Sequence, residues 1–217
     1  MTTLAVMKAR IVREIRRSNL TTDIDAAITT AIEAYQHERL AFNESREFTF
    51  ATVTSQEIYT SSDDADLGNI IKFDYVNYVQ GSNSWPLDPL TPARIEYLNA
   101  AGSFTGEPQG YCWYNERMRI YPVPAAVYTI RIGCVKKIAA PASDSEASNR
   151  WMTDAELLIR CRAKYELYAH VILNGTMAEY FNPERDGSPT KQALERLQIK
   201  ASRVAQQGGY AVMPTQF

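Results

Sequence analysis

The chain has few of the residues that carry most enzyme chemistry. Its 217 residues include only two histidines and three cysteines, and the glycine-rich phosphate loops and the G-x-S-x-G nucleophile motif are missing. His37 and His170 fall in helical patterns without a partner at metal-ligand spacing, so we expect structural or surface roles for both. Cys112, Cys134 and Cys161 are too widely separated for a disulfide framework, which predicts three buried thiols. These patterns predict a protein that is not an enzyme and holds no metal or cofactor.

The chain also lacks a strong net charge and a long apolar run. Lys and Arg number 23 against 25 Asp and Glu, so the net charge of −2 provides no overall attraction to nucleic acid or to an anionic membrane. No apolar run approaches the ~18 residues of a membrane span, and charges from Lys8 onward argue against a signal peptide. We expect a protein made in the cytoplasm, with no membrane partner.

Two sets of carboxylates could carry chemistry, but neither has a specific pattern. One is an acidic loop that holds Asp63, Asp64 and Asp66. Because this loop has no downstream Glu of a calcium-binding loop, we interpret it as solvated. The other is Glu33 with Glu38 or Glu44, which could supply the acid and base of glycoside hydrolysis. Any chain with 25 acidic residues offers such pairs, so a cell-wall hydrolase is a remote alternative.

Hydrophobic periodicity predicts an α+β fold. Apolar residues recur at spacings of three and four near both ends of the chain, whereas the middle alternates with a period of two and is rich in β-branched and aromatic residues. Thr91 and Pro92 predict the start of one short helix within this middle part. We therefore expect a helical hairpin (1–46), an antiparallel β-rich insert (47–138), C-terminal helices that complete a bundle of four main helices (150–207) and an extended tail (208–217).

Local signals predict where individual elements begin and end. The stretch from Thr153 to Glu156 matches a capping box and predicts the start of a long helix, with Met152 packing on Leu157. Gly175 predicts the end of that helix. A two-residue turn, Asn-Glu, predicts a hairpin between GYCWY and RMRIY. In the strand NIIKFDYVNYV, the residues predicted to share the buried face are Ile71, Phe73, Tyr75 and Val79.

The first helix carries the strongest local charge. Its cations are Lys8, Arg10, Arg13, Arg16 and Arg17. A solvated helix face is one interpretation, and a surface for phosphates or for acidic helices of another subunit is the other. The interleaved aromatic residues of a single-strand binder are missing there, which counts against nucleic acid.

A rigid corner and an apolar tail complete the candidate sites. Pro122 and Pro124 follow Tyr121 in the stretch RMRIYPVPAAVYTIRI, and because proline fixes φ and lacks an N–H, the chain must leave one strand and enter the next at a stiff angle. The tail offers apolar side chains with no nearby partner in the sequence, so it is either disordered or inserted into a partner. These tail residues are Tyr210, Val212, Met213 and Phe217.

An ordered set of segments resembles the head-to-tail adaptor (head-completion, tail accessory) proteins of short-tailed bacteriophages. The segments, in chain order, are ITTAIEAYQHERLAFNESREFTFATVTSQEIYT, GEPQGYCWYNERMRIYPVPAAVYTIRIGCVKK and NRWMTDAELLIRCRAKYELYAHVI. The resemblance covers roughly residues 3 to 175, and its strength lies in the order of the segments rather than in any one motif.

The resemblance implies a structural virion protein at the head–tail junction. Such adaptors form a ring of twelve copies beneath the portal protein, bind it through their C-terminal region, and present a docking surface for tail components such as nozzle, hub or fibre proteins. Genomic DNA passes through the channel without sequence-specific binding. The tail would then be the portal anchor, and the basic first helix would contact a neighbouring subunit or the channel. A DNA-binding or packaging-associated protein that uses this helix is the alternative from another class.

Overall fold

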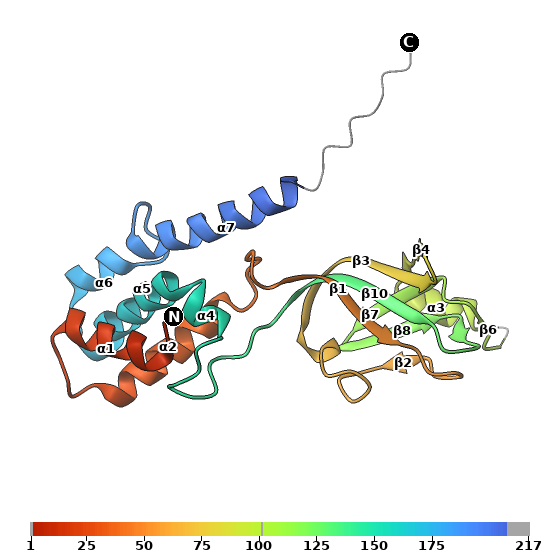
Figure 1. The fold of residues 1–217 in the computed structure, drawn as a ribbon, viewed down its shortest axis with the longest axis horizontal. Coiled ribbons are helices and arrows are strands. Elements are labelled where there is room, and N and C mark those ends of the chain that lie inside the picture. Colours follow the sequence, from red (N-terminus) through yellow and green to blue (C-terminus); the bar gives the residue numbers. More distant parts are fainter. Residues whose placement is uncertain (1, 101, 208–217) are drawn as a thin grey trace, which may run out of the picture. The chain divides into compact units, whose positions relative to one another are not determined.

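The computed structural model describes residues 2–100 and 102–207, and the chain forms two compact units (Figure 1). One unit, Met1–Phe42 with Ile138–Phe217, is helical, and the other, Asn43–Lys137, is rich in strands. Each unit has its own buried core. The α+β class predicted from the sequence is therefore confirmed.

The helical unit is organised around one central helix. Its elements are α1 (Leu4–Ile15), α2 (Thr21–Tyr35), α4 (Arg150–Thr153), α5 (Glu156–Glu166), a π-helical turn η2 (Leu167–Val171), α6 (Gly175–Phe181) and α7 (Pro189–Gln207). α5 packs against α1, α2, α6 and α7. The core gathers apolar side chains from all of them, and Trp151 is the largest fully buried one. This described part has six α-helices, more than the four main helices that we expected.

The predicted capping box is wrong. Thr153 ends the short helix α4 instead of capping α5, and its hydroxyl donates to the carbonyl of Asn149, the residue that caps α4. Trp151 explains the interruption, because its ring is fully buried and its Nε1 donates to the carbonyl of Ile138 at 2.9 Å. Met152 is buried, whereas Leu157 is 41% exposed, which does not favour the expected packing of this pair.

The predicted end of the long helix is also wrong. Gly175 begins α6 rather than ending a helix, since the side chain of Asn174 accepts a hydrogen bond from the backbone N–H of Met177 and caps α6. The preceding helix ends at Val171, and Leu173 takes the left-handed conformation that is common just after a helix and usually falls to glycine. The break therefore lies two residues closer to the N-terminus than Gly175.

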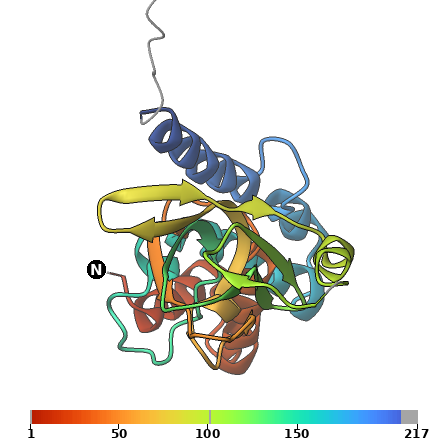
Figure 2. The same cartoon turned by 90° about the vertical axis from the view of Figure 1, so that its right-hand side faces the viewer.

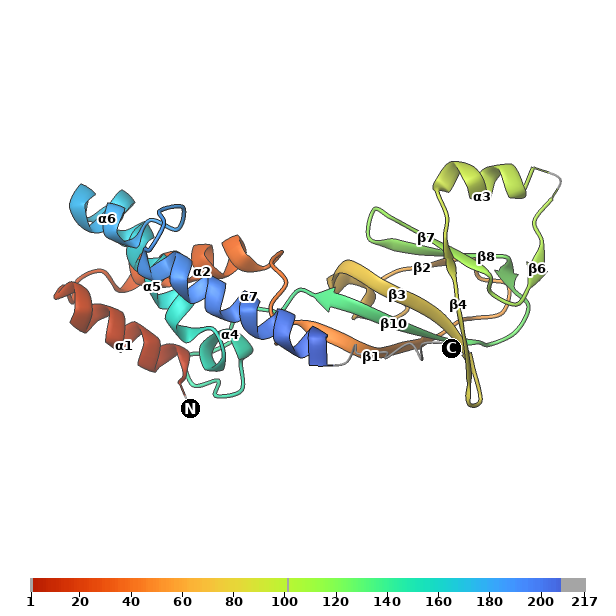
Figure 3. The same cartoon turned by 90° about the horizontal axis from the view of Figure 1, so that it is seen from above.

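The β-rich unit contains two four-stranded sheets and a two-stranded one. Its elements are β1 (Glu44–Ala51), β2 (Ile58–Tyr59), η1 (Leu67–Asn69), β3 (Ile70–Gln80), β4 (Asn83–Pro86), β5 (Asp88–Pro89), α3 (Pro92–Leu98), β6 (Thr105–Gly106), β7 (Gly110–Tyr114), β8 (Arg117–Tyr121), β9 (Val123–Pro124) and β10 (Thr129–Lys136). The strand orders are β1-β10-β3-β4, β2-β8-β7-β5 and β6-β9. The β3–β4 hairpin is the long yellow ribbon in Figure 2, and Figure 3 shows α3 on the side of β7 and β8.

The buried face of β3 differs from the predicted one. The buried side chains of β3 are Ile70, Val76 and Tyr78; of the predicted face, Phe73 does pack against the core, whereas Tyr75 is exposed. The pairing of β3 with β10 shifts register between Gly133 and Cys134, and a β-bulge of this kind reverses which side chains face the core. Strict alternation along β3 could not predict this reversal, because the bulge arises in the pairing with another strand.

Pro122 and Pro124 lie where the chain passes between sheets. β8 belongs to one four-stranded sheet, β9 pairs in parallel with β6, and β10 belongs to the other four-stranded sheet. Pro122 and Pro124 are buried, and the Tyr121–Pro122 peptide bond is cis. The backbone N–H of Val123 between the two prolines donates to the carbonyl of Phe104 at 2.9 Å. The corner thus connects three sheets and keeps its remaining donor satisfied.

Candidate functional site

The basic helix α1 presents two kinds of cation. Thr3 caps the helix by accepting a hydrogen bond from the backbone N–H of Val6 at 3.4 Å. Met7, Ile11 and Ile15 face the core, which leaves the charged residues on the remaining sides. The structure divides these cations into a group with acidic partners inside the protomer and a group that is exposed.

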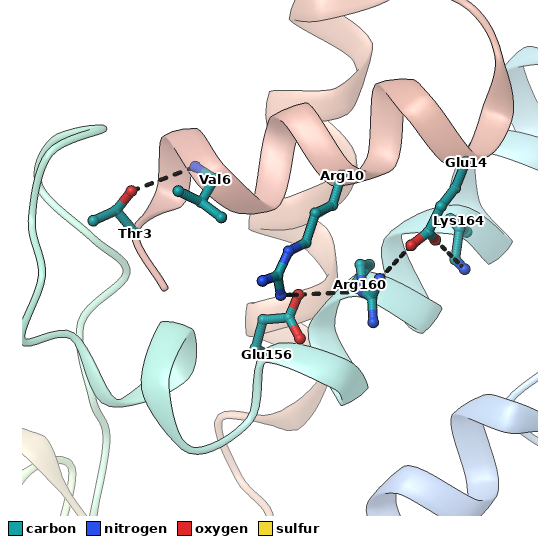
Figure 4. A network of polar contacts seen from close by, with 7 residues as sticks. All are labelled: Thr3, Val6, Arg10, Glu14, Glu156, Arg160 and Lys164. Atoms are coloured by element: carbon teal, nitrogen blue, oxygen red, sulfur yellow. Dashed lines mark hydrogen bonds and ion pairs between the residues drawn. The ribbon is translucent and has the colours of Figure 1, made fainter. Parts of the chain in front are cut away.

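A chain of alternating charges joins α1 to α5 (Figure 4). Arg10 Nη1 lies 3.0 Å from Glu156 Oε1, which also lies 3.2 Å from Arg160 Nε. Arg160 pairs in turn with Glu14, whose other carboxylate oxygen lies 2.7 Å from Lys164 Nζ. Because α1 and α5 are far apart in the sequence, this network fixes the position of the N-terminal helix on the central one.

Lys8 is also engaged within the protomer. Its Nζ lies 2.8 Å from a carboxylate oxygen of Asp25 on α2 and 2.6 Å from one of Asp144 in the loop before α4. Partial burial opposes the charge, but the hydrogen bonds to these two carboxylates outweigh it and raise the pKa of Lys8. Lys8 and Arg10 therefore have a structural role that the sequence did not predict.

Arg13, Arg16 and Arg17 form the exposed group, which we call the arginine cluster. All three are solvent-exposed, and within the described residues none makes an ion pair. They lie at the C-terminal end of α1, where the partial negative charge of a helix end favours cations. The arginine cluster is thus the part of the predicted basic surface that is available to another molecule.

The acidic loop has local partners for its carboxylates. Asp63 accepts hydrogen bonds from Thr60 and Gln56, which outweigh its partial burial and lower the pKa of its carboxyl. Asp64 accepts from the backbone N–H of Asp66, and Asp66 pairs with Lys136 at 2.7 Å. In the described part of the chain, no group of three or more His, Cys, Asp or Glu side chains could hold a metal ion.

The remaining predicted residues are scattered. Glu33 is exposed on α2, Glu38 accepts a hydrogen bond from Gln198, and Glu44 begins β1 in the β-rich unit. His37 is exposed, and His170 Nε2 lies 3.4 Å from Glu166. The expected burial of the cysteines is confirmed for all three of them. The acid–base pair of the hydrolase alternative therefore draws its members from separate elements with separate partners.

Sequence reasoning missed a group of exposed apolar residues at the end of η2 and after it. Leu173 is 77% exposed, and Val171 and Tyr180 nearby in the chain are also exposed. The helical period predicts a buried face up to Ile172, which does pack against the core, but it gives no reason to expect a large exposed side chain just after it, where the π-helical turn ends. No local signal in the sequence marks that change of helix type.

The predicted tail contacts, Tyr210, Val212, Met213 and Phe217, lie outside the described residues. None of the helices in residues 2–100 and 102–207 is both long and apolar enough to cross a bilayer.

Comparison with known proteins identifies the family. No curated protein matches the chain. The family model described as SU10 adaptor protein matches residues 2–214, which is nearly the whole sequence, and this match confirms the predicted resemblance. The chain therefore belongs to the SU10 adaptor protein family, a family of phage head-to-tail adaptors.

Proposed function

We propose that this adaptor forms a ring beneath the portal protein, closes the filled head and offers tail components a docking surface around the DNA channel. The match to an adaptor family over residues 2–214 carries the proposal. Membership of a phage adaptor family makes the chain a structural virion component with portal and tail proteins as its general partners. Two units with separate cores suit this role, since one could contact neighbouring copies while the other binds a different partner.

Electron microscopy and native mass spectrometry of the protein with and without portal rings test this proposal. We expect a closed ring of adaptor copies, twelve by the resemblance, on each portal ring. A protein that stays monomeric and unbound in the presence of portal rings would contradict it. The portal ring alone and an unrelated protein ring of similar size are the controls.

We propose further that the tail, residues 208–217, anchors the adaptor to the portal. Its apolar side chains, Tyr210, Val212, Met213 and Phe217, would supply the buried contact area that an interface core needs. Deletion of residues 208–217 should abolish portal binding and leave the thermal unfolding of the monomer unchanged. Substitution of the same segment by a Gly/Ser stretch of equal length separates the effect of the side chains from that of the chain length. Unchanged portal binding by either variant would refute the anchor.

A second candidate function is contact with DNA through the arginine cluster. The observation that favours it is the exposure of Arg13, Arg16 and Arg17 without ion pairs in the described structure. If they neutralise phosphates of duplex DNA, the triple Arg→Gln variant should lower the slope of log affinity against log salt by about 0.9 for each phosphate that it no longer neutralises. Lys72→Gln with Arg117→Gln, two exposed cations of the β-rich unit, is the control. If the slope of log affinity against log salt is the same for wild type and all variants, the arginine cluster does not bind DNA, and contact with a neighbouring subunit is its remaining proposed role.

A further inference from the structure

Leu173 is an apolar side chain that its own protomer does not bury. It is 77% exposed, and its φ of 57° lies in the left-handed region, where the Cβ of an L-residue crowds the carbonyl oxygen. Hydrogen bonds on both sides hold this backbone in place, from the Ile172 N–H to the Leu167 carbonyl at 2.7 Å and from the Asn174 N–H to the Tyr168 carbonyl at 2.9 Å. An unfavourable backbone that presents a large apolar side chain to solvent indicates a contact with another molecule.

A pocket that fits such a side chain lies at the start of α5. Its volume is near 160 Å³, and its walls are Asp154, Ala155, Leu157, Leu158, Ala193, Arg196 and Leu197. This volume is below the roughly 300–1,000 Å³ of ligand sites and well above the ~30 Å³ share of one water molecule. Because the wall is mostly aliphatic, the pocket suits one branched aliphatic side chain better than water.

Leu173, which we call the knob, and the pocket lie at opposite ends of the continuous helix formed by α5 and η2. Leu158 lines the pocket, and Val171 ends η2 just before Leu173, so about 20 Å of helical rise separates them. Figure 3 shows α4, at the pocket end, and α6, at the knob end, on opposite sides of α5. The Leu173 side chain therefore cannot fill the pocket of its own protomer, whereas a second copy can supply it.

The charges beside the knob and the pocket are complementary. Arg196 on the pocket wall is exposed and makes no ion pair within the described residues. Glu179 on α6, the helix that follows Leu173, is exposed; its one ion-pair partner in the described residues, Arg185, is at 3.9 Å, and Asn182 donates a hydrogen bond to it at 3.3 Å. The carboxylate on the pocket wall, Asp154, already pairs with Arg150 at 2.5 Å. An approach of Glu179 of one copy to Arg196 of the other would therefore favour insertion of Leu173 in this orientation.

We propose that Leu173 of one copy inserts into the pocket between α5 and α7 of the next copy. The contact joins two different surfaces of the same chain, so repetition of it closes a ring or extends a filament. The inference rests on the proposed ring for its biological setting, and it names the surfaces through which neighbouring copies meet.

Cysteine cross-linking between two differently labelled copies tests the contact. Leu173→Cys chains are mixed with Leu157→Cys chains and oxidised, in concentrated solution and on portal rings. Both positions are exposed, and the three native cysteines are buried, so only the new thiols are available. We expect a disulfide-linked heterodimer well above the background given by Val127→Cys, an exposed position in the β-rich unit, mixed with Leu157→Cys. A disulfide between two Leu173→Cys chains in place of the heterodimer would overturn the proposal, as would background levels under both conditions.

A second variant separates this inference from the proposed function. Leu173→Asp should weaken self-association at least ten-fold in sedimentation and should prevent ring closure on the portal, while its thermal unfolding temperature is no lower than that of wild type, because Asp tolerates the left-handed backbone at this position. If Leu173→Asp still forms complete rings on the portal, the inference fails and the proposed function stands. If wild type forms no ring yet gives the heterodimer in solution, the head-to-tail contact stands and the ring beneath the portal fails.

Discussion

Tyr75 on β3 lies across Gly133 on β10 and reaches β1. The two residues are opposite each other in the sheet, and a Cβ at Gly133 would come within 2.3 Å of the Tyr75 ring. The Tyr75 hydroxyl donates to the backbone carbonyl of Arg46 on β1. One aromatic side chain therefore spans three neighbouring strands, and the missing side chain at Gly133 makes the crossing possible.

Gly133→Ala should lower the free energy of unfolding by about 1–3 kcal/mol, because the new methyl group displaces the Tyr75 ring and its hydrogen bond. In a Tyr75→Ala background the same substitution should stabilise by roughly 0.5–1 kcal/mol, since Ala is favoured over Gly within a strand. Urea unfolding of wild type, both single variants and the double variant measures the coupling. Additive effects would contradict the contact.

Glu14 holds two cations of α5, and one of them, Lys164, is almost buried beside the Phe181 ring at 4.2 Å. Glu14→Gln should destabilise the protein by about 1–3 kcal/mol because Lys164 loses its carboxylate partner in a partly desolvated site. Arg13→Gln on the same helix is the matched control, and we expect it within about 0.5 kcal/mol of wild type. Equal thermal unfolding of both variants would show that the network contributes nothing.

The hairpin of β7 and β8 turns through Asn115 and Glu116, which both have positive φ, of 48° and 55°. Asn-Gly is the preferred pair for such a type I′ turn. Glu116→Gly should raise stability by about 1 kcal/mol, because the left-handed conformation costs Glu but not Gly. Glu116→Ala removes the same exposed ion pair with Lys137 without relieving the backbone, so it should give no gain in urea unfolding.

Burial raises the pKa of Cys134 to about 11, from an ordinary value of 9.0. The folded state keeps a proton that the unfolded chain releases, so this contribution to stability is complete below pH 9 and declines as the pH rises towards 11. The urea midpoint of wild type should fall as the pH rises from 8 to 10.5, and the midpoint of Cys134→Ala should fall less steeply. The residual slope comes from other groups whose pKa burial also raises, which are Cys112, Cys161, Tyr35, Tyr59, Tyr78, Tyr111 and Tyr168. Parallel curves for the two proteins would rule out Cys134 as a source.

Leu173 should lower the stability of the monomer while it strengthens self-association. Leu173→Asn is expected to stabilise the monomer by about 1 kcal/mol, because Asn tolerates the left-handed region, and to weaken self-association. Leu173→Ala keeps the unfavourable backbone and removes most of the side chain, so it should weaken association without the gain in thermal stability. A less stable Leu173→Asn protein would show that Leu173 packs within its own protomer.

Elements with strong local signals were predictable. The short helix α3 begins as expected, with Thr91 as its cap and Pro92 at its first position, because both act on the backbone beside them. The Asn115–Glu116 turn and the burial of the cysteines were predicted for similar reasons. The end of the helix before Leu173 and the buried face of β3 were not, since a π-helical turn and a bulge arise from packing against other elements.

The sequence predicts which cations α1 carries, but not which of them have acidic partners inside the protomer and which are exposed. The cations of α1 are readable from the sequence, yet their acidic partners include Asp144 and Glu156, more than a hundred residues further along the chain. Only the tertiary structure decides that Lys8 and Arg10 hold the protomer together while the arginine cluster is exposed.

The sequence by itself determined the α+β class, through its hydrophobic periods, and the adaptor family, through the order of its segments along nearly the whole chain. The fold class depends on residues that are close together in the chain, and the family depends on the order of segments along it. The tertiary structure decided which side chains are left without partners inside the protomer, because burial and ion pairing depend on elements that are distant in the sequence. Leu173 and the pocket at the start of α5 are of this second kind.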